Sequence, residues 1–118
     1  MARDHRKLKA FELADRLVVA VYRESRRFPP DEKFSLTSQL RRLAIAVPEQ
    51  IVKACACESQ EDYLSFLQDA LISLRGVGYL IELSNKLEFL EEKRMAGLLE
   101  LHDDAGKVLA GLIRSISK

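Results

Sequence analysis

The stretch IAVPEQIVKACACES, residues 45–59, places a proline and two closely spaced cysteines inside a pattern that is otherwise helical. Pro48 falls where a helix would run on, although proline lacks an amide hydrogen and crowds the preceding turn. The stretch has three possible interpretations: a kinked binding helix, a metal or redox site at Cys55 and Cys57, or an ordinary packed element. The residues around it decide among them.

Apolar residues on both sides of this stretch recur at intervals of three and four, the spacing of a helix with one buried face. The pattern predicts four helices, at about residues 8–27, 35–55, 59–86 and 91–116. No segment of comparable length alternates as a strand would. Pro29 and Pro30 separate the first two helices because proline disfavours helix at the residue before it. Ser59 suits the N-cap of the third helix, with Asp62 at the capping-box position.

The predicted connections are short, at about residues 28–34, 55–58 and 86–90. Short connections favour antiparallel neighbours, so we expect an all-α, antiparallel up-down-up-down four-helix bundle. The 118 residues, of which 47% are hydrophobic and 31% charged, suit a single soluble domain covering residues 1–118. The longest apolar runs are far shorter than a bilayer requires, so we expect no membrane contact. Without a secretory signal, and with only two cysteines, a cytoplasmic location is expected.

The residue types that carry catalysis or bind metals do not occur at useful spacings. On a helix, Cys55 and Cys57 would point about 200° apart and could not share one zinc ion. His5 and His102 complete no set of ligands, and neither common phosphate-loop motif occurs in the sequence. We therefore predict no metal, no cofactor and no enzymatic activity, and we interpret the cysteines as structural. His102, beside Asp103, is interpreted as a hydrogen-bonded core or interface histidine.

Charge is distributed unevenly along the chain. Residues 1–57 hold 12 Lys and Arg against 7 Asp and Glu, a balance of +5, whereas residues 58–118 hold 7 against 11, a balance of −4. A basic half can contact nucleic-acid phosphates, and it can equally pair with the acidic half of another subunit. The candidate phosphate-binding residues are Arg3, Arg6, Lys7, Lys9, Arg41, Arg42 and Lys53. The plainer alternative is a solvated helix surface, since no aromatic residue is interleaved for base stacking.

Two consecutive runs carry a family resemblance: FPPDEKFSLTSQLRRLAIAVPEQIVKA and SQEDYLSFLQDALISLRG. They contain F-P-x-x-E before the second helix, S-Q-L-R-R-x-A at 38–44, the Val47-Pro48 pair, and F-L-x-x-A-x-x-S-L at 66–74. In these elements, and over roughly residues 8–116, the chain resembles the four-helix-bundle proteins encoded in bacterial 23S rRNA intervening sequences. The accessory variability protein of diversity-generating retroelements belongs to the same broad group.

The resemblance implies an antiparallel four-helix protomer that assembles into a homopentamer and has no known enzymatic chemistry. The retroelement member binds nucleic acid and a reverse transcriptase through basic surfaces. RNA, DNA or a nucleic-acid enzyme is therefore an expected partner here, beside other copies of the chain. The alternative is an assembly or protein-interaction module that binds no nucleic acid. Relatives carry a proline within the second helix, which implies that Pro48 kinks the helix without ending it.

The chain departs from the family pattern at two places. Where relatives read close to S-I-P-S-N-I-A-E-G-x-G-R, the Asn, Glu and Gly are replaced by Gln50, Lys53 and Ala54, and Gly76 and Gly78 stand where the third helix usually carries glutamates. An unpaired buried lysine would be costly, so we expect Lys53 to reach solvent or an acid of another subunit. We expect the two glycines to permit close contact between helices.

Overall fold

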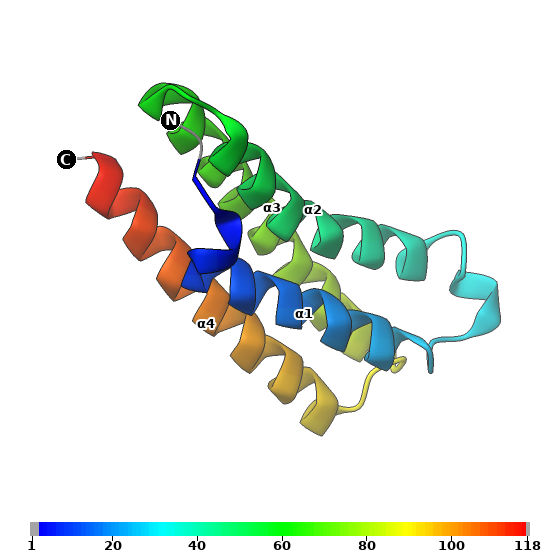
Figure 1. The fold of residues 1–118 in the computed structure, drawn as a ribbon. Coiled ribbons are helices and arrows are strands. Elements are labelled where there is room, and N and C mark those ends of the chain that lie inside the picture. The colour runs from blue at the N-terminus through cyan, green and yellow to red at the C-terminus, as the bar shows by residue number, and fades with distance from the viewer. Residues whose placement is uncertain (1–2, 118) are drawn as a thin grey trace.

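The computed structural model describes residues 3–117 and contains helices and no strand over that range, as the all-α prediction requires. Its four long helices are α1 (Lys9–Ser25), α2 (Leu36–Ala56), α3 (Gln60–Lys86) and α4 (Glu92–Ser117). Two short 3-10 turns, η1 (His5–Lys7) and η2 (Pro30–Glu32), precede α1 and α2. Consecutive helices run in opposite directions, as the colour gradient in Figure 1 shows.

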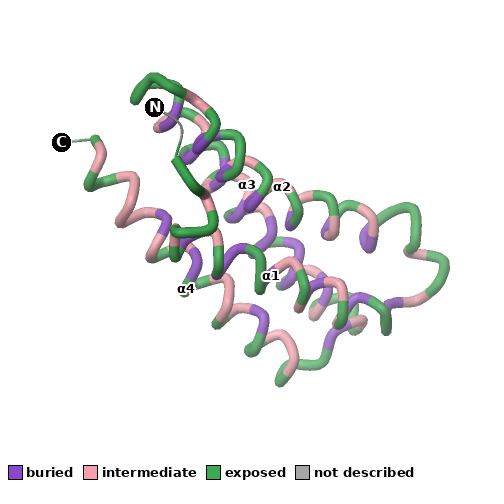
Figure 2. Tube along the Cα trace, viewed as in Figure 1, coloured by how far each residue is buried: buried purple, intermediate pink, exposed green. Residues whose placement is uncertain are grey.

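The helices form an elongated bundle of 45 × 24 × 19 Å. Each helix packs against two others: α1 and α3 each contact α2 and α4, whereas the diagonal pairs make no contact among the described residues. Buried positions recur along each helix, with exposed positions between them (Figure 2). This arrangement is the four-helix bundle expected from short connections and one buried stripe per helix.

The core is formed by the apolar stripes that the sequence pattern predicts. Leu40, Val47 and Ile51 of α2 are buried against α3, which contributes Leu67 and Leu74, and all five are at most 1% exposed. Burying a side chain of this size stabilises the fold by about 1.5–3 kcal/mol relative to leaving it in water. The pairing of α2 with α3 is the most extensive in the bundle and fixes the arrangement of both helices.

Pro48 lies inside α2 and is buried, and the helix continues beyond it to Ala56. The expectation that this proline does not end the helix is therefore confirmed. The chain leaves the helix at Cys57, and α3 begins three residues later. Ser59 caps that start, its hydroxyl accepting a hydrogen bond from the amide of Asp62 at 3.1 Å. Capping satisfies one of the amides that a helix start leaves unpaired.

Two glycines of α3 lie where side chains of neighbouring helices fill the space that a Cβ would take. A Cβ at Gly76 would lie 2.5 Å from Cδ2 of Leu43 on α2, and a Cβ at Gly78 would lie 2.7 Å from Nε2 of His102 on α4. Ordinary Cβ contacts are not that short, so a larger residue would force one of these side chains to move. The expected role of Gly76 and Gly78 in close helix contact is thus confirmed.

By length and mean hydropathy, 1.2 over its best window, α3 could also cross a membrane. The predicted absence of membrane contact considered only unbroken apolar runs and so did not detect this helix. A core helix of a soluble bundle passes the same test, and the apolar residues Leu67, Leu74 and Ile81 of α3 are fully or almost fully buried inside the bundle. Packing within the bundle therefore accounts for part of the apolar character of α3, since 39% of that window is buried.

Substituting Gly78→Ala should lower the free energy of unfolding by about 1 kcal/mol, because the new methyl group displaces His102 from its hydrogen bond. The matched control is Gly97→Ala on α4, where a Cβ would have no neighbour within 4 Å. That control should raise the free energy of unfolding by about 0.5–1 kcal/mol through helix propensity alone. Urea unfolding followed by circular dichroism measures both, and equal effects at the two positions would contradict the close contact.

Candidate nucleic-acid interface

The N-terminal arm is fixed against the ends of α2 and α3. The guanidinium of Arg3 stacks over the ring of Tyr63 at 3.7 Å from its centroid, and the Arg3 amide donates to the carbonyl of Cys55 at 2.7 Å. Arg6 pairs with Asp4 at 3.0 Å, and hydrogen bonding from that guanidinium lowers the pKa of the Asp4 carboxyl. The two arginines therefore already have partners within the chain.

Lys7 and Lys9 are exposed beside them, in η1 and at the start of α1. Lys7 has no ion pair within residues 3–117, whereas Lys9 lies 3.3 Å from Glu12, which also pairs with Arg16 at 2.8 Å. Exposed pairs of this kind contribute little and open readily. Both lysines therefore remain available to an incoming phosphate.

Arg41 is only partly exposed and has partners within the bundle, and its phosphate-binding role stays a prediction. Its Nε donates to Oγ of Ser25 at 2.8 Å, and a terminal nitrogen donates to the carbonyl of Tyr22 at 3.4 Å. The guanidinium also stacks over the ring of Tyr22, 4.6 Å from its centroid. Because these partners belong to α1, the arginine joins α2 to α1, and two of its three guanidinium nitrogens already donate within the bundle.

Arg42 and Lys53 are exposed on α2, and Arg42 donates to Oγ of Ser38 at 3.1 Å. The expectation that Lys53 reaches solvent is confirmed, whereas an acid from another subunit stays a prediction. In the same altered segment Ala54 is fully buried, and Oε1 of Gln50 is buried without a hydrogen-bond partner among the described residues. The seven predicted residues thus occupy two regions, the N-terminal arm and α2, and do not converge on one site.

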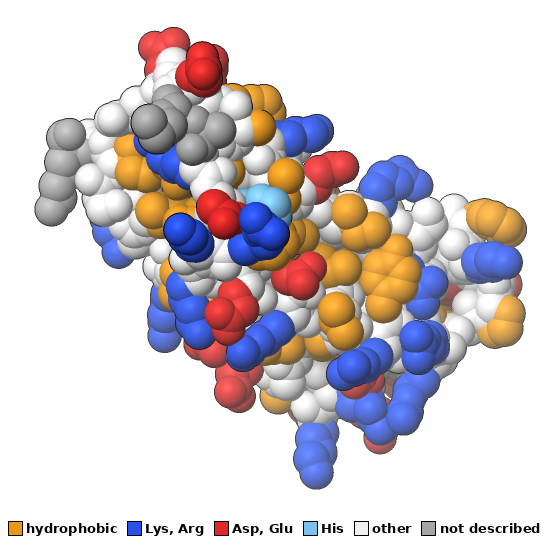
Figure 3. All heavy atoms as spheres, in the orientation of Figure 1, with side chains coloured by type: hydrophobic (Ala, Val, Ile, Leu, Met, Phe, Trp, Pro, Cys, Tyr) orange, Lys and Arg blue, Asp and Glu red, His pale blue; other side chains and the backbone are white. Residues whose placement is uncertain are grey.

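Other cations gather elsewhere on the surface. Figure 3 shows Lys and Arg side chains concentrated toward the end of the molecule where α1 ends, with several acids among them. Arg23, Arg26 and Arg27 are exposed there, and none forms an ion pair with a described residue. Arg23 lies in the last turn of α1, where a basic side chain suits the helix dipole, and Arg26 and Arg27 follow directly after the helix ends.

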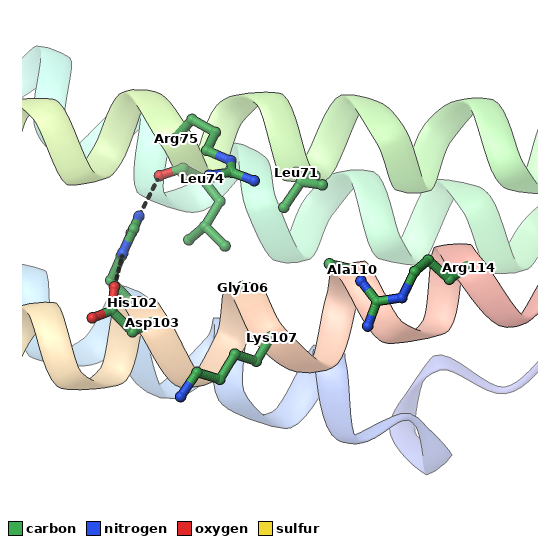
Figure 4. Close-up of a pocket in the computed structure, with 9 residues that line it drawn as sticks. All are labelled: Leu71, Leu74, Arg75, His102, Asp103, Gly106, Lys107, Ala110 and Arg114. Carbon is green, nitrogen blue, oxygen red and sulfur yellow. Dashed lines mark hydrogen bonds and ion pairs between the residues drawn. The ribbon is translucent and has the colours of Figure 1, made fainter.

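A hollow of about 380 Å³ lies between α3 and α4 and was not predicted from the sequence (Figure 4). It is lined by Leu71, Leu74 and Arg75 of α3 and by His102, Asp103, Gly106, Lys107, Ala110 and Arg114 of α4. Within residues 3–117, Arg75, Lys107 and Arg114 form no ion pair.

These three cations were not apparent when charge was counted over each half of the chain, because the net charge of residues 58–118 is negative. A finer count would have found two of them, since residues 105–118 contain no Asp or Glu. Lys107 and Arg114 are seven residues apart, which places them on one side of a helix. The position of Arg75 opposite them follows only from how α3 packs on α4.

His102 closes one end of the hollow and is largely buried, with 16% of its side chain exposed. Its Nε2 lies 3.0 Å from the carbonyl oxygen of Leu74, and its Nδ1 lies 2.9 Å from Oδ1 of Asp103. The interpretation of His102 as a hydrogen-bonded packing residue is confirmed. The Leu74 bond joins α4 to α3 at the position that Gly78 leaves open.

The two cysteines are free thiols at the end of α2. Burial raises the pKa of the Cys55 thiol, and the nearby Arg3 opposes that shift only in part. Cys57 is partly exposed, and its Sγ lies 3.3 Å from the carbonyl of Lys53. Within residues 3–117, no three His, Cys, Asp or Glu side chains come together in a way that could hold a metal ion. These surroundings agree with a packing role for Cys55.

Arg41→Ala and Arg42→Ala should differ in their effect on stability, although the two arginines are adjacent in the chain. Removing Arg41 deletes a charged hydrogen bond to Ser25 and a ring contact, so the free energy of unfolding should fall by about 1–3 kcal/mol. Removing the Arg42 side chain deletes only an exposed hydrogen bond to Ser38, so the free energy of unfolding should change by less than about 0.5 kcal/mol. Urea unfolding of both variants is the measurement; a larger loss for Arg42→Ala would contradict the assignment.

The fold and these surfaces can be compared with known proteins. No curated protein matches the chain. A family model described as 23S rRNA-intervening sequence protein matches residues 6–111, from the 3-10 turn η1 well into α4. The match thus covers most of the bundle, including all of α1, α2 and α3. This chain belongs to the 23S rRNA-intervening sequence protein family.

Proposed function

We propose that this protein is a non-enzymatic, homo-oligomeric scaffold that binds nucleic acid through its exposed cations. The observation that supports the proposal is a set of exposed Lys and Arg side chains that form no ion pair within residues 3–117. The set includes Lys7, Arg23, Arg26, Arg27, Arg42, Lys53, Arg75, Lys107 and Arg114. Cations without an internal ion pair can contact phosphates without first separating from an acid within the protein.

These cations belong to the arm, to all four long helices and to the connection after α1, so they would contact a nucleic acid at several places on the surface. Such contacts release counterions, and affinity then falls as salt rises. Contacts to phosphates position a nucleic acid without reading its bases. The scaffold is therefore expected to bind RNA or DNA with little sequence preference.

Exposed apolar side chains support self-assembly. On α3, Ile72 is 69% exposed and Tyr79 is 58% exposed, and their spacing of seven places them on one side of the helix. Further apolar side chains are exposed on other helices, Val19 on α1 and Ile45 and Val52 on α2, and Figure 3 shows hydrophobic side chains gathered on the face that carries α1. Two different apolar surfaces on one protomer suit a head-to-tail contact, which closes into a ring when the rotation allows it.

The same surfaces favour a second candidate function, an assembly or protein-interaction module without nucleic-acid binding. In that case the basic first half of one subunit would pair with the acidic second half of another. The two functions differ in what the exposed cations contact, and this can be measured. The pentameric state is an expectation from the family resemblance, and the two apolar surfaces are compatible with any closed ring.

Binding of a short mixed-sequence RNA should weaken when Arg42 and Lys53 are replaced together by Gln. With two phosphate contacts fewer, the slope of log affinity against log salt should become shallower by about 2, as measured by fluorescence anisotropy. Glu49→Gln, an exposed change on the same helix, is the matched control and should not weaken binding. If RNA does not bind, or if binding does not weaken as salt rises, the protein is not a nucleic-acid scaffold. The second candidate, an assembly module without nucleic-acid binding, would then be favoured.

Ile72→Glu should dissociate the oligomer, because it places a charge in the centre of the apolar surface of α3. Its side chain is 69% exposed in the protomer, so the fold itself should remain stable. Light scattering after size exclusion measures the mass, with Ala96→Glu at an exposed position of α4 as the control. If the parent protein is a monomer, or if Ile72→Glu leaves its mass unchanged, α3 does not form the contact.

A further inference from the structure

The hollow between α3 and α4 is lined by one arginine from each of its two helices. Arg75 extends from α3, and Arg114 extends from α4 back toward Ala110 (Figure 4). Lys107 runs along the outer edge of α4 in the same view. A guanidinium group offers parallel N–H donors that match the oxygens of a phosphate, and its charge is independent of pH in the ordinary range.

The charge of the lining suits a doubly charged anion. Arg75, Lys107 and Arg114 carry three positive charges, and Asp103 is the one acid among the lining residues. The balance, leaving the imidazole out of the count, is +2. A phosphomonoester carries about −1.5 to −2 at pH 7, whereas each phosphate within a nucleic-acid chain carries one negative charge. The lining therefore matches a terminal phosphate better than an internal one.

The floor of the hollow is apolar and open. It is formed by Leu71 and Leu74 on one helix and by Gly106 and Ala110 on the other. Both residues on α4 are small, and a Cβ at Gly106 would make an ordinary van der Waals contact with Cδ2 of Leu74 at 3.5 Å. An apolar floor under a few polar groups, at about 380 Å³, is typical of a site for a small organic ligand. The flat face of a base or a sugar would suit this floor.

The walls of the hollow are held in place before any ligand arrives. His102 contacts the carbonyl of Leu74 across the two helices, and its other ring nitrogen contacts Asp103. Asp103 is thereby occupied at the end of the hollow, away from Arg114 (Figure 4). A site whose walls are already ordered loses less free energy when it binds a ligand.

From these observations we infer that the groove between α3 and α4 binds a phosphomonoester that is attached to a nucleoside. Arg75 and Arg114 hold the phosphate, Lys107 adds charge at the outer edge, and the apolar floor receives the nucleoside. The ligand is either a free nucleotide or the phosphorylated end of a nucleic acid, since both present the same group. The inference goes beyond the proposed scaffold function, because the groove would bind a single phosphomonoester, whereas the scaffold contacts several phosphates along a nucleic-acid chain.

Calorimetric titration with uridine 5′-monophosphate and with uridine tests the site at a fixed salt concentration. The nucleotide should bind at least about tenfold more tightly than the nucleoside, since uridine lacks the charged contacts. Arg75→Gln and Arg114→Gln should each weaken nucleotide binding by about tenfold. Lys93→Gln, an exposed cation outside the hollow, is the matched control and should not change it. Thermal unfolding verifies each variant, and if Arg114→Gln does not fold, Arg75→Gln decides.

A second titration distinguishes the source of the phosphate. Two RNAs of the same sequence, one with a 5′-phosphate and one with a 5′-hydroxyl, are compared on the parent protein and on Arg75→Gln. A preference for the phosphorylated RNA that Arg75→Gln abolishes assigns the site to nucleic-acid ends, and binding of the nucleotide alone assigns it to free nucleotides. If uridine binds as well as its monophosphate, or if both Gln variants bind like the parent, the inference is wrong. Equal binding of both RNAs without nucleotide binding would overturn it while leaving the scaffold function intact.

Discussion

The close approach permitted by two glycines of α3 is the constraint on which the rest of the structure depends. Gly76 and Gly78 leave open the positions that Leu43 of α2 and His102 of α4 occupy. A bulky polar residue at either position would hold the neighbouring helix away. The hollow between α3 and α4 has its depth and its fixed walls because His102 joins the two helices beside it.

Much of the fold could be predicted from the sequence because its signals are local. The four long helices begin and end within two residues of the predicted bounds, and Ser59 caps the third helix as expected. Pro48 was harder to interpret, because proline more often ends a helix than lies within one. Here the resemblance to relatives with an internal proline decided the interpretation, and the structure agrees.

The functional surface was less predictable, because it depends on contacts between residues far apart in the chain. Arg41 and Arg42 are alike in type and position, and only the packing of α1 on α2 shows that the first is occupied by Ser25 and Tyr22. Arg75 faces Arg114 only because α3 and α4 pack side by side. Periodicity predicts which side of a helix is buried, but it does not predict which neighbour covers each remaining side chain.

The two kinds of exposed surface, cationic and apolar, together define the proposed scaffold. Native mass spectrometry of the parent protein at low salt, with and without a short mixed-sequence RNA, tests both in one measurement. The account predicts a homo-oligomer whose mass increases by that of bound RNA. A monomer that gains no RNA mass would contradict it.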